Sequence, residues 1–486
     1  MAALVAVIAV CLLAVPVGTK AYDHPKDALL IVAGLPIIGL SFVQGFVFGI
    51  PLHFFSLLCA ACLWWTVRAV QGHLLKTSIE TLLLRLTLIA LCIIAVGSGY
   101  ALEALIIAGL VNTAVVMMQS FGVPVPHPSM VMKGSKYSRR FRPVGLQGNE
   151  NFSGLFLVPC VFASLALSMY MIAIILAIGV ALSRCKVAMC AVGCGLLFIV
   201  SPFIAIPALI VVVFNMINVP SFRYRLDYWR AAWETVRREW IFGVGLNSWK
   251  MYVAEDFRRA GLGGKERVKT LPDGKVVEAV LKPPRRSHND YIQAVLETGV
   301  LGVFFTVMIF ATAFLLSDGW MRAGVAALAV CGLGFHNLSL PSIAGAFWLF
   351  ILSAVSGAGG VVAENPYVPF AMMLCAPLCM PFVARVIADC LLLKAHRAKD
   401  RQEAYALLRQ AEAVNPDDEN VQMALVIIEH GNDMPHEAFT RCNRLATNYT
   451  GEIILEYLFA NLEHLWDRVV KRQNPYKAKT KMYKGC

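Results

Sequence analysis

Residues 79–97 read IETLLLRLTLIALCIIAVG, a stretch that is long enough and apolar enough to cross a membrane as a single helix. A hydrocarbon core about 30 Å thick requires roughly 17 to 25 mostly apolar residues per helix. Comparable runs recur from Met1 to about Ala395. Because 58% of the 486 residues are apolar and only 15% are charged, the composition excludes an ordinary soluble domain of this size. The sequence therefore predicts an all-α, polytopic membrane helix bundle.

We expect about 12 to 13 membrane spans. The first run lacks the basic start of a secretory signal, so we interpret it as a span. A transmembrane domain is expected over residues 1–395, with a large basic external loop at 220–290, and a C-terminal helical tail over 396–486. The predicted spans lie near residues 1–18, 28–48, 51–70, 79–97, 101–121, 152–167, 169–184, 187–200, 203–219, 291–316, 321–339, 343–361 and 367–391.

Three polar stretches interrupt the apolar pattern, and functional residues are expected there because loops carry most binding and catalytic groups. The first, residues 123–150, contains the basic cluster Lys133, Lys136, Arg139, Arg140 and Arg142. The second, residues 220–288, holds fifteen Lys and Arg against eight Asp and Glu. The third is the tail from about Lys394.

The tail has the periodicity of helical hairpins. Ala404 and Ala438 are 34 residues apart, as are Tyr405 and Phe439, which is similar to one or two degenerate tetratricopeptide repeats. A pair of amphipathic hairpins with chance spacing explains the pattern about as well. The tail is then either a docking surface for a protein partner or a simple helical cap.

The most informative motif lies where the long polar stretch enters a predicted span. His288-Asn289 is followed, after nine residues, by Gly299-Val300-Leu301-Gly302. At the water boundary a titratable imidazole can reach both a polar acceptor and a lipid headgroup. In this motif the chain resembles the O-antigen ligase and O-antigen polymerase superfamily, which includes bacterial protein O-oligosaccharyltransferases.

Further motifs follow in the order that the resemblance requires, between Arg142 and Gly357. They are Gly148-Asn149-Glu150-Asn151, Ser183-Arg184, the Arg-x-x-x-Trp pattern from Arg225 to Trp229, and Gly243-Val244-Gly245. Each is weak alone, but together they are fairly specific. Ligases, polymerases and protein transferases share this core, so the motifs leave the acceptor open.

The resemblance implies transfer of a glycan from a polyprenyl diphosphate, most plausibly undecaprenyl diphosphate, to an acceptor hydroxyl with inversion at the anomeric carbon. The acceptor would be a glycolipid, a glycan or a protein, and no nucleic acid partner is expected. Such a reaction needs cations for the diphosphate and a base or hydrogen-bond acceptor for the hydroxyl. Arginine suits the first task because its planar fork binds phosphate oxygens in pairs.

The resemblance accordingly assigns Arg184 and Arg225 to the diphosphate and His288 to the acceptor hydroxyl. Without the resemblance, Arg184 would be interpreted as an interfacial anchor, and the alternative for His288 is a residue that begins a helix. His336-Asn337 repeats the dipeptide without the glycines and is expected to be a packed or supporting pair. Further substrate-binding candidates are Asn289, Arg285, Arg286, Trp229, Asn149 and Asn151.

The sequence contains no phosphate-binding loop, no His-Glu-x-x-His motif and no Asp-x-Asp in a polar loop. We therefore expect metal-independent chemistry without a cofactor. The resemblance places the protein among the lipids of the bacterial inner membrane, with the large loop and the tail in the periplasm. A transporter or flippase for an anionic lipid-linked substrate is the competing function, and a scaffold whose tail recruits a partner is a third.

Overall fold

The chain divides into two compact units, Met1–Val386 and Ile387–Cys486. Residues 387–395, which the sequence placed in the transmembrane domain, fall in the second unit. The computed structural model describes residues 1–12, 24–43, 46–48, 50–72, 75–123, 125, 143–205, 207–208, 210, 220–262, 266–270, 276–280, 286–335, 337–356, 361–363, 384–392, 394–395, 398, 400–416, 418–432, 437–438 and 441.

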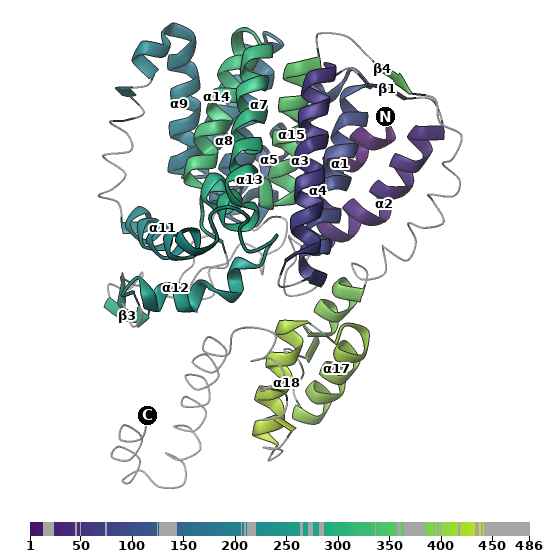
Figure 1. Cartoon of the computed structure of the whole chain (residues 1–486), viewed down its shortest axis with the longest axis vertical. Coiled ribbons are helices and arrows are strands. Elements are labelled where there is room, and N and C mark those ends of the chain that lie inside the picture. The colour runs from purple at the N-terminus through teal and green to yellow at the C-terminus, as the bar shows by residue number, and fades with distance from the viewer. Residues whose placement is uncertain are drawn as a thin grey trace. The chain divides into compact units, whose positions relative to one another are not determined.

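The first unit is a bundle of mostly apolar helices, so the predicted helical membrane fold is confirmed (Figure 1). The predicted spans near 203–219 and 367–391 lie largely outside the described residues. The helices of the bundle are α1 (Ala2–Leu12), α2 (His24–Val43), α3 (Leu52–Val70), α4 (Leu75–Val96), α5 (Ala101–Ser120), α7 (Glu150–Ala166), α8 (Tyr170–Leu182), α9 (Lys186–Val200), α13 (Asp290–Leu316), α14 (Gly319–Gly334) and α15 (Pro341–Val355).

Length separates two kinds of helix in the bundle. Among the described residues, four helices are long and apolar enough to cross a membrane, namely α3, α4, α5 and α13. The apolar helices α7, α8, α9, α14 and α15 have 13 to 17 residues. At 1.5 Å per residue, a 15-residue helix extends only about 23 Å, which is less than the roughly 30 Å thickness of a hydrocarbon core.

Two of the shorter helices form the centre of the core. Every residue of α7 from Ser153 to Leu165 is buried, and α7 packs against α5, α8, α9, α14 and α15. In α15 the residues from Ser342 to Leu352 are all buried. Small residues allow this close packing, because a Cβ on Gly324 would lie 2.8 Å from the Cβ of Phe162.

The long polar stretch forms a separate layer of short elements. It contains α11 (Pro220–Glu239), η2 (Trp249–Met251), α12 (Val253–Arg259), and the antiparallel strands β2 (Glu266–Thr270) and β3 (Val276–Val280). Helices α11 and α12 lie across one end of the bundle (Figure 1). The buried carboxylate of Asp256 joins them, because it accepts hydrogen bonds from Trp249 Nε1 (2.9 Å) and Arg238 Nη2 (2.7 Å).

A second strand pair lies near the end of the bundle away from α11 and α12 (Figure 1). Strand β1 (Phe46–Phe48) runs antiparallel to β4 (Val361–Ala363), with Phe46 opposite Ala363. The sequence predicted neither this pair nor β2 and β3. Strands of three to five residues have too short a pattern to stand out from the apolar runs beside them.

The second unit contains the helical hairpin of α17 (Arg401–Val414) and α18 (Glu419–Gly431). Its core joins Leu408 and Ala411 of α17 to Leu425 of α18, and Ala388 and Leu392 pack against the same cluster. The further hairpin expected after Glu437 lies mostly outside the described residues. Its likeness to tetratricopeptide repeats therefore stays a prediction.

Candidate functional site

The centre of the candidate site is the turn that carries His288. This residue has a left-handed backbone conformation, with φ of 57°, between the buried residues Ser287 and Asn289. Hydrogen bonds hold the turn on both sides. Trp229 Nε1 donates to the carbonyl of Ser287 (3.0 Å), and the backbone N–H of Ser287 donates to Gln293 Oε1 (2.8 Å). Because left-handed backbone is unfavourable for a residue with a Cβ, the turn depends on these contacts.

Asn289 begins helix α13. Its side-chain oxygen accepts hydrogen bonds from the backbone N–H groups of Tyr291 (2.9 Å) and Ile292 (3.0 Å), which a helix start leaves unsatisfied. Its amide nitrogen donates to the carbonyl of Leu333 (2.8 Å) at the end of α14. Asn289 thus caps one helix and binds another, and its contact with a substrate stays a prediction.

Two aromatic rings enclose the imidazole of His288. Tyr228 of α11 stacks on it with ring centroids 5.7 Å apart, and Phe335 meets it edge to face at 5.4 Å. Burial, together with the positive charges of Arg225 and Arg286, lowers the pKa of His288 to about 4. The imidazole is therefore neutral near pH 7 and can accept a hydrogen bond.

Arg225 lies beside this histidine. Its Nη1 donates to the carbonyl of Gly334 (2.6 Å), and its guanidinium lies over the ring of Phe335, 5.0 Å from the centroid. Burial lowers the pKa of Arg225, but the group remains a cation at any physiological pH. Within the described residues no carboxylate forms an ion pair with it. A half-buried cation of this kind is suited to bind an anionic ligand.

Arg184 lies in the tight turn between α8 and α9, with φ of 58°, and its side chain is exposed. One packing contact connects the start of α9, directly after this turn, with the rest of the site. A Cβ on Gly334, whose carbonyl binds Arg225, would lie 2.8 Å from the side chain of Val187. The start of α7 also packs against the site, because Phe152 meets the ring of Phe335 edge to face with centroids 5.5 Å apart. The elements that carry Arg184 and Arg225 are thus packed at the same end of the bundle.

The glycine motifs explain how α11 and its loop are fastened to α13. Gly299 interrupts α13 with φ of 70° and ψ of −168°. The backbone of Val244 and Gly245 donates to the carbonyls of Leu296 (2.8 Å) and Glu297 (2.9 Å), and Val300 N donates to the carbonyl of Trp240 (2.9 Å). The Gly-Val-Gly segment therefore docks its backbone on a kink that a side chain would block.

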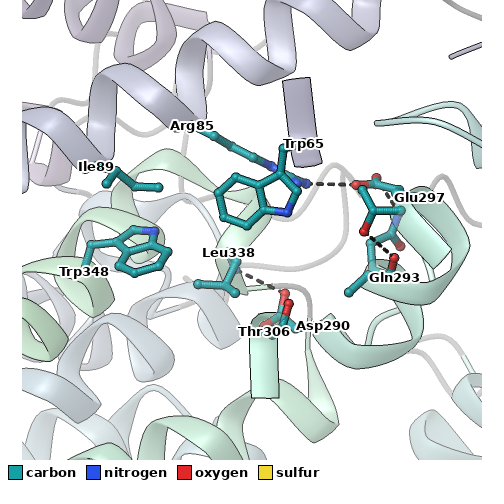
Figure 2. Close-up of a pocket in the computed structure, with 11 residues that line it drawn as sticks. Trp65, Arg85, Ile89, Asp290, Gln293, Glu297, Thr306, Leu338 and Trp348 are labelled. Carbon is teal, nitrogen blue, oxygen red and sulfur yellow. Dashed lines mark hydrogen bonds and ion pairs between the residues drawn. The ribbon is translucent and has the colours of Figure 1, made fainter. Parts of the chain in front are cut away.

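Sequence reasoning missed a polar pocket next to this site. It lies among α3, α4, α13 and α15, and its lining includes Asp290, Gln293 and Glu297 together with Arg85 (Figure 2). Arg85 Nη2 forms an ion pair with Glu297 Oε2 at 2.9 Å. The sequence does contain a sign of this pocket. Arg85 and Glu297 are ionisable residues within two predicted spans, and such residues are functional candidates by default.

Asp290, two residues after His288 in the sequence, also lines the pocket. Its carboxylate accepts hydrogen bonds from the backbone N–H of Asn337 (2.9 Å), from Asn337 Nδ2 (3.1 Å) and from the backbone N–H of Leu338 (3.2 Å). These bonds tie the start of α13 to η3 (Asn337–Ser339). Asn337 is thus a buried supporting residue, whereas its neighbour His336 lies outside the described residues.

The structure brings together His288, Arg225, Arg286, Asn289 and Trp229 from the predicted set. Trp229 uses its indole N–H to hold the His288 turn. Asn149 caps α7 by accepting from the backbone N–H of Asn151 (2.8 Å). Arg285 lies outside the described residues. Contact of any of these residues with a substrate stays a prediction.

Metal-binding side chains do not cluster in the described part of the chain, where His, Cys, Asp and Glu form no group of three or more that could hold an ion. The independence from metals and cofactors that the sequence suggested stays a prediction.

A family described as O-Antigen ligase matches residues 153–307, which include Arg184, Arg225 and the His288 turn. This match confirms the resemblance to the O-antigen ligase and polymerase superfamily in that part of the chain, and it supports a membrane glycosyltransferase-like function in general. No curated protein matches the chain.

Proposed function

We propose that the protein transfers a glycan from a polyprenyl diphosphate to an acceptor hydroxyl. The observation that carries the proposal is the neutral imidazole of His288 beside the cation of Arg225, which forms no ion pair with a described carboxylate. One group can accept a hydrogen bond from a hydroxyl, and the other can bind the diphosphate. The match to the O-Antigen ligase family over these residues supports this assignment.

In the proposed reaction the acceptor oxygen attacks the anomeric carbon and the bond from that carbon to the diphosphate breaks. The configuration at the anomeric carbon inverts in a single displacement. Arg225 and Arg184 bind the departing polyprenyl diphosphate, and His288 orients the hydroxyl and takes its proton. Charge develops on the leaving phosphate in the transition state, where fixed cations stabilise it most.

The electrostatics of the site favour binding of the donor before the acceptor. Without a ligand, the positive charges of Arg225 and Arg286 contribute to the low pKa of His288. A bound diphosphate neutralises those charges, so it raises the pKa of His288 and makes the imidazole a stronger base. Donor binding would thus prepare the histidine for the acceptor.

We place this reaction at the periplasmic face of the bacterial inner membrane, where the resemblance puts the large loop. The acceptor is a glycolipid, a glycan or a protein, and undecaprenyl diphosphate is the proposed carrier. The basic character of residues 220–288 supports an anionic ligand at this face.

The test is a transfer assay with purified protein, lipid-linked oligosaccharide and candidate acceptors, with a chelator present. His288→Ala should lower the transfer rate by roughly 10² to 10⁴ while donor binding stays intact. Arg225→Lys should weaken both donor binding and rate, because lysine lacks the bidentate fork. Arg322→Lys is the matched control, since Arg322 follows the opposite end of α13 and pairs with Asp318.

A flippase or transporter predicts a different pattern. Substitutions at His288 and Arg225 would then alter lipid movement equally, and the wild-type protein would form no covalent glycan product. A His288→Ala variant that transfers glycan at the wild-type rate would refute the assigned role of the histidine.

A further inference from the structure

We infer that Gln293, Glu297 and Arg85 are positioning residues that fix the His288 turn through a continuous chain of hydrogen bonds. The effect on catalysis rests on the proposed function, whereas the series of hydrogen bonds rests on geometry alone. Arg85 belongs to α4, outside the residues matched by the family, so these hydrogen bonds would connect the site to a distant part of the bundle.

The first link is at the turn. The backbone N–H of Ser287, the residue that precedes His288, donates to Gln293 Oε1 at 2.8 Å. The other end of the same amide, Gln293 Nε2, donates to Glu297 Oε1 at 2.7 Å. Ser287, Gln293 and Glu297 are 0%, 3% and 1% exposed, so water cannot replace these partners easily.

The second link determines which way the amide of Gln293 points. An ionised carboxylate can only accept hydrogen bonds, so the NH₂ group of Gln293 must face Glu297 and its carbonyl oxygen must face Ser287. Arg85 Nη2 donates to the other carboxylate oxygen, Glu297 Oε2, at 2.9 Å, so both oxygens of Glu297 act as acceptors. The charge of Arg85 therefore determines the orientation of an amide on another helix (Figure 2).

The third link is the histidine itself. His288 has a left-handed backbone that the turn must enforce. Ser287 Oγ donates across it to the carbonyl of Asn289 (2.9 Å), and the Ser287 N–H bond to Gln293 joins the turn to the side chains of α13. If the amide of Gln293 rotates or is removed, Ser287 loses its acceptor and the turn can relax. The imidazole would then leave its place between Tyr228 and Phe335.

The experiment compares two pocket variants by kinetics and by amide hydrogen exchange. Gln293→Met removes both amide bonds at nearly constant side-chain length. Thr306→Val is the matched control, because Thr306 lines the same pocket but, among the described residues, bonds only to the carbonyl of Gly302 in its own helix (2.9 Å). The measurements are kcat, the KM for donor and for acceptor, and the exchange rate of the Ser287 amide.

We expect Gln293→Met to accelerate exchange at Ser287 by roughly 5- to 100-fold, as for a buried donor that has lost its acceptor. The value of kcat should fall by about tenfold or more, with both KM values unchanged, since donor and acceptor sites remain. Thr306→Val should alter none of these quantities. Equal exchange and equal kcat in Gln293→Met and the wild type would overturn the inference.

A second comparison covers the case in which Gln293→Met does not fold. The double variant Arg85→Met with Glu297→Gln removes the buried charges together, and Arg85→Lys keeps them. The inference predicts that kcat falls about fivefold or more in the double variant and recovers in Arg85→Lys; identical kcat in both would overturn it. If the wild-type protein has no transferase activity, only the proposed function is refuted. Hydrogen exchange at the Ser287 amide still decides whether these hydrogen bonds fix the His288 turn.

Discussion

Replacement of Gly299 by alanine tests whether the loop that carries α11 depends on the kink in α13. A Cβ at this position would collide with the carbonyl oxygen of Ile241 and lie 2.7 Å from the backbone nitrogen of Phe242. Since both neighbours are backbone, relief requires the Trp240–Gly245 segment to move away. The movement breaks the three backbone bonds that join this segment to α13.

The expected magnitude follows from these contacts. The positive φ costs a residue with a Cβ about 1 kcal/mol, and three lost hydrogen bonds cost about 1 kcal/mol each. The sum, about 4 kcal/mol, exceeds the effect of most single substitutions. For a unit of this size it corresponds to a decrease in the melting temperature of about 5 °C.

Thermal unfolding of the purified variant in detergent is the assay, and Gly193→Ala is its control. Gly193 also lies in a helix of the bundle, but a Cβ there would meet no atom within 4 Å. We expect the control to melt within about 1 °C of the wild type, because alanine is the better helix former. If Gly299→Ala melts with the control and transfers glycan normally, the docking argument is refuted.

Three further outcomes are expected. Because burial and two arginines lower the pKa of His288 to about 4, kcat/KM should stay constant from pH 7 to about 5 and fall at lower pH, where the imidazole gains a proton. Arg286→Gln should move the acidic fall in kcat/KM to higher pH. A wild-type midpoint near pH 6.5 would contradict the burial of His288. In thermal unfolding, Asn289→Ala should cost about 2 kcal/mol, whereas Asn289→Asp should cost less because it keeps the helix cap. Arg441→Met should lower the free energy of unfolding of the second unit by about 3 kcal/mol, because it leaves the buried carboxylate of Glu429 unpaired. Faster limited proteolysis of α17 and α18 would detect this loss. Protease resistance equal to that of the wild type would contradict the prediction.

The helices of the bundle could be predicted because each coincides with a continuous apolar run, and the bilayer permits few other structures for such runs. The His288 turn could also be found, since its signature is contiguous and lies at a change from polar to apolar sequence. The pairing of Arg85 with Glu297 could not be found, because their positions differ by 212 and no local pattern joins them. Only the charge of each residue within an apolar run hinted at a partner.

The motif glycines could also be found in the sequence, but the tertiary contact that requires them could not. Gly243, Gly245 and Gly299 belong to predicted motifs, but no local pattern explains why these positions are glycine. The reason is a backbone contact between two segments, which appears only when the loop docks on α13. Arg184 represents the opposite case, since the structure places it in an exposed turn and its role still depends on a ligand.

The ion pair between Arg85 and Glu297 also constrains the order of events during biosynthesis. Ribosomes add roughly 5 to 20 residues per second, so α4 leaves the ribosome on the order of 10 to 40 s before the part of α13 that holds its partner. An arginine in the middle of a span costs about 3 kcal/mol on insertion, and for that interval the nascent helix has no carboxylate from α13 to offset the penalty. Until α13 arrives, the guanidinium must remain hydrated at a lipid headgroup or in a water-filled defect. The completed bundle thus depends on a late helix to stabilise an early one.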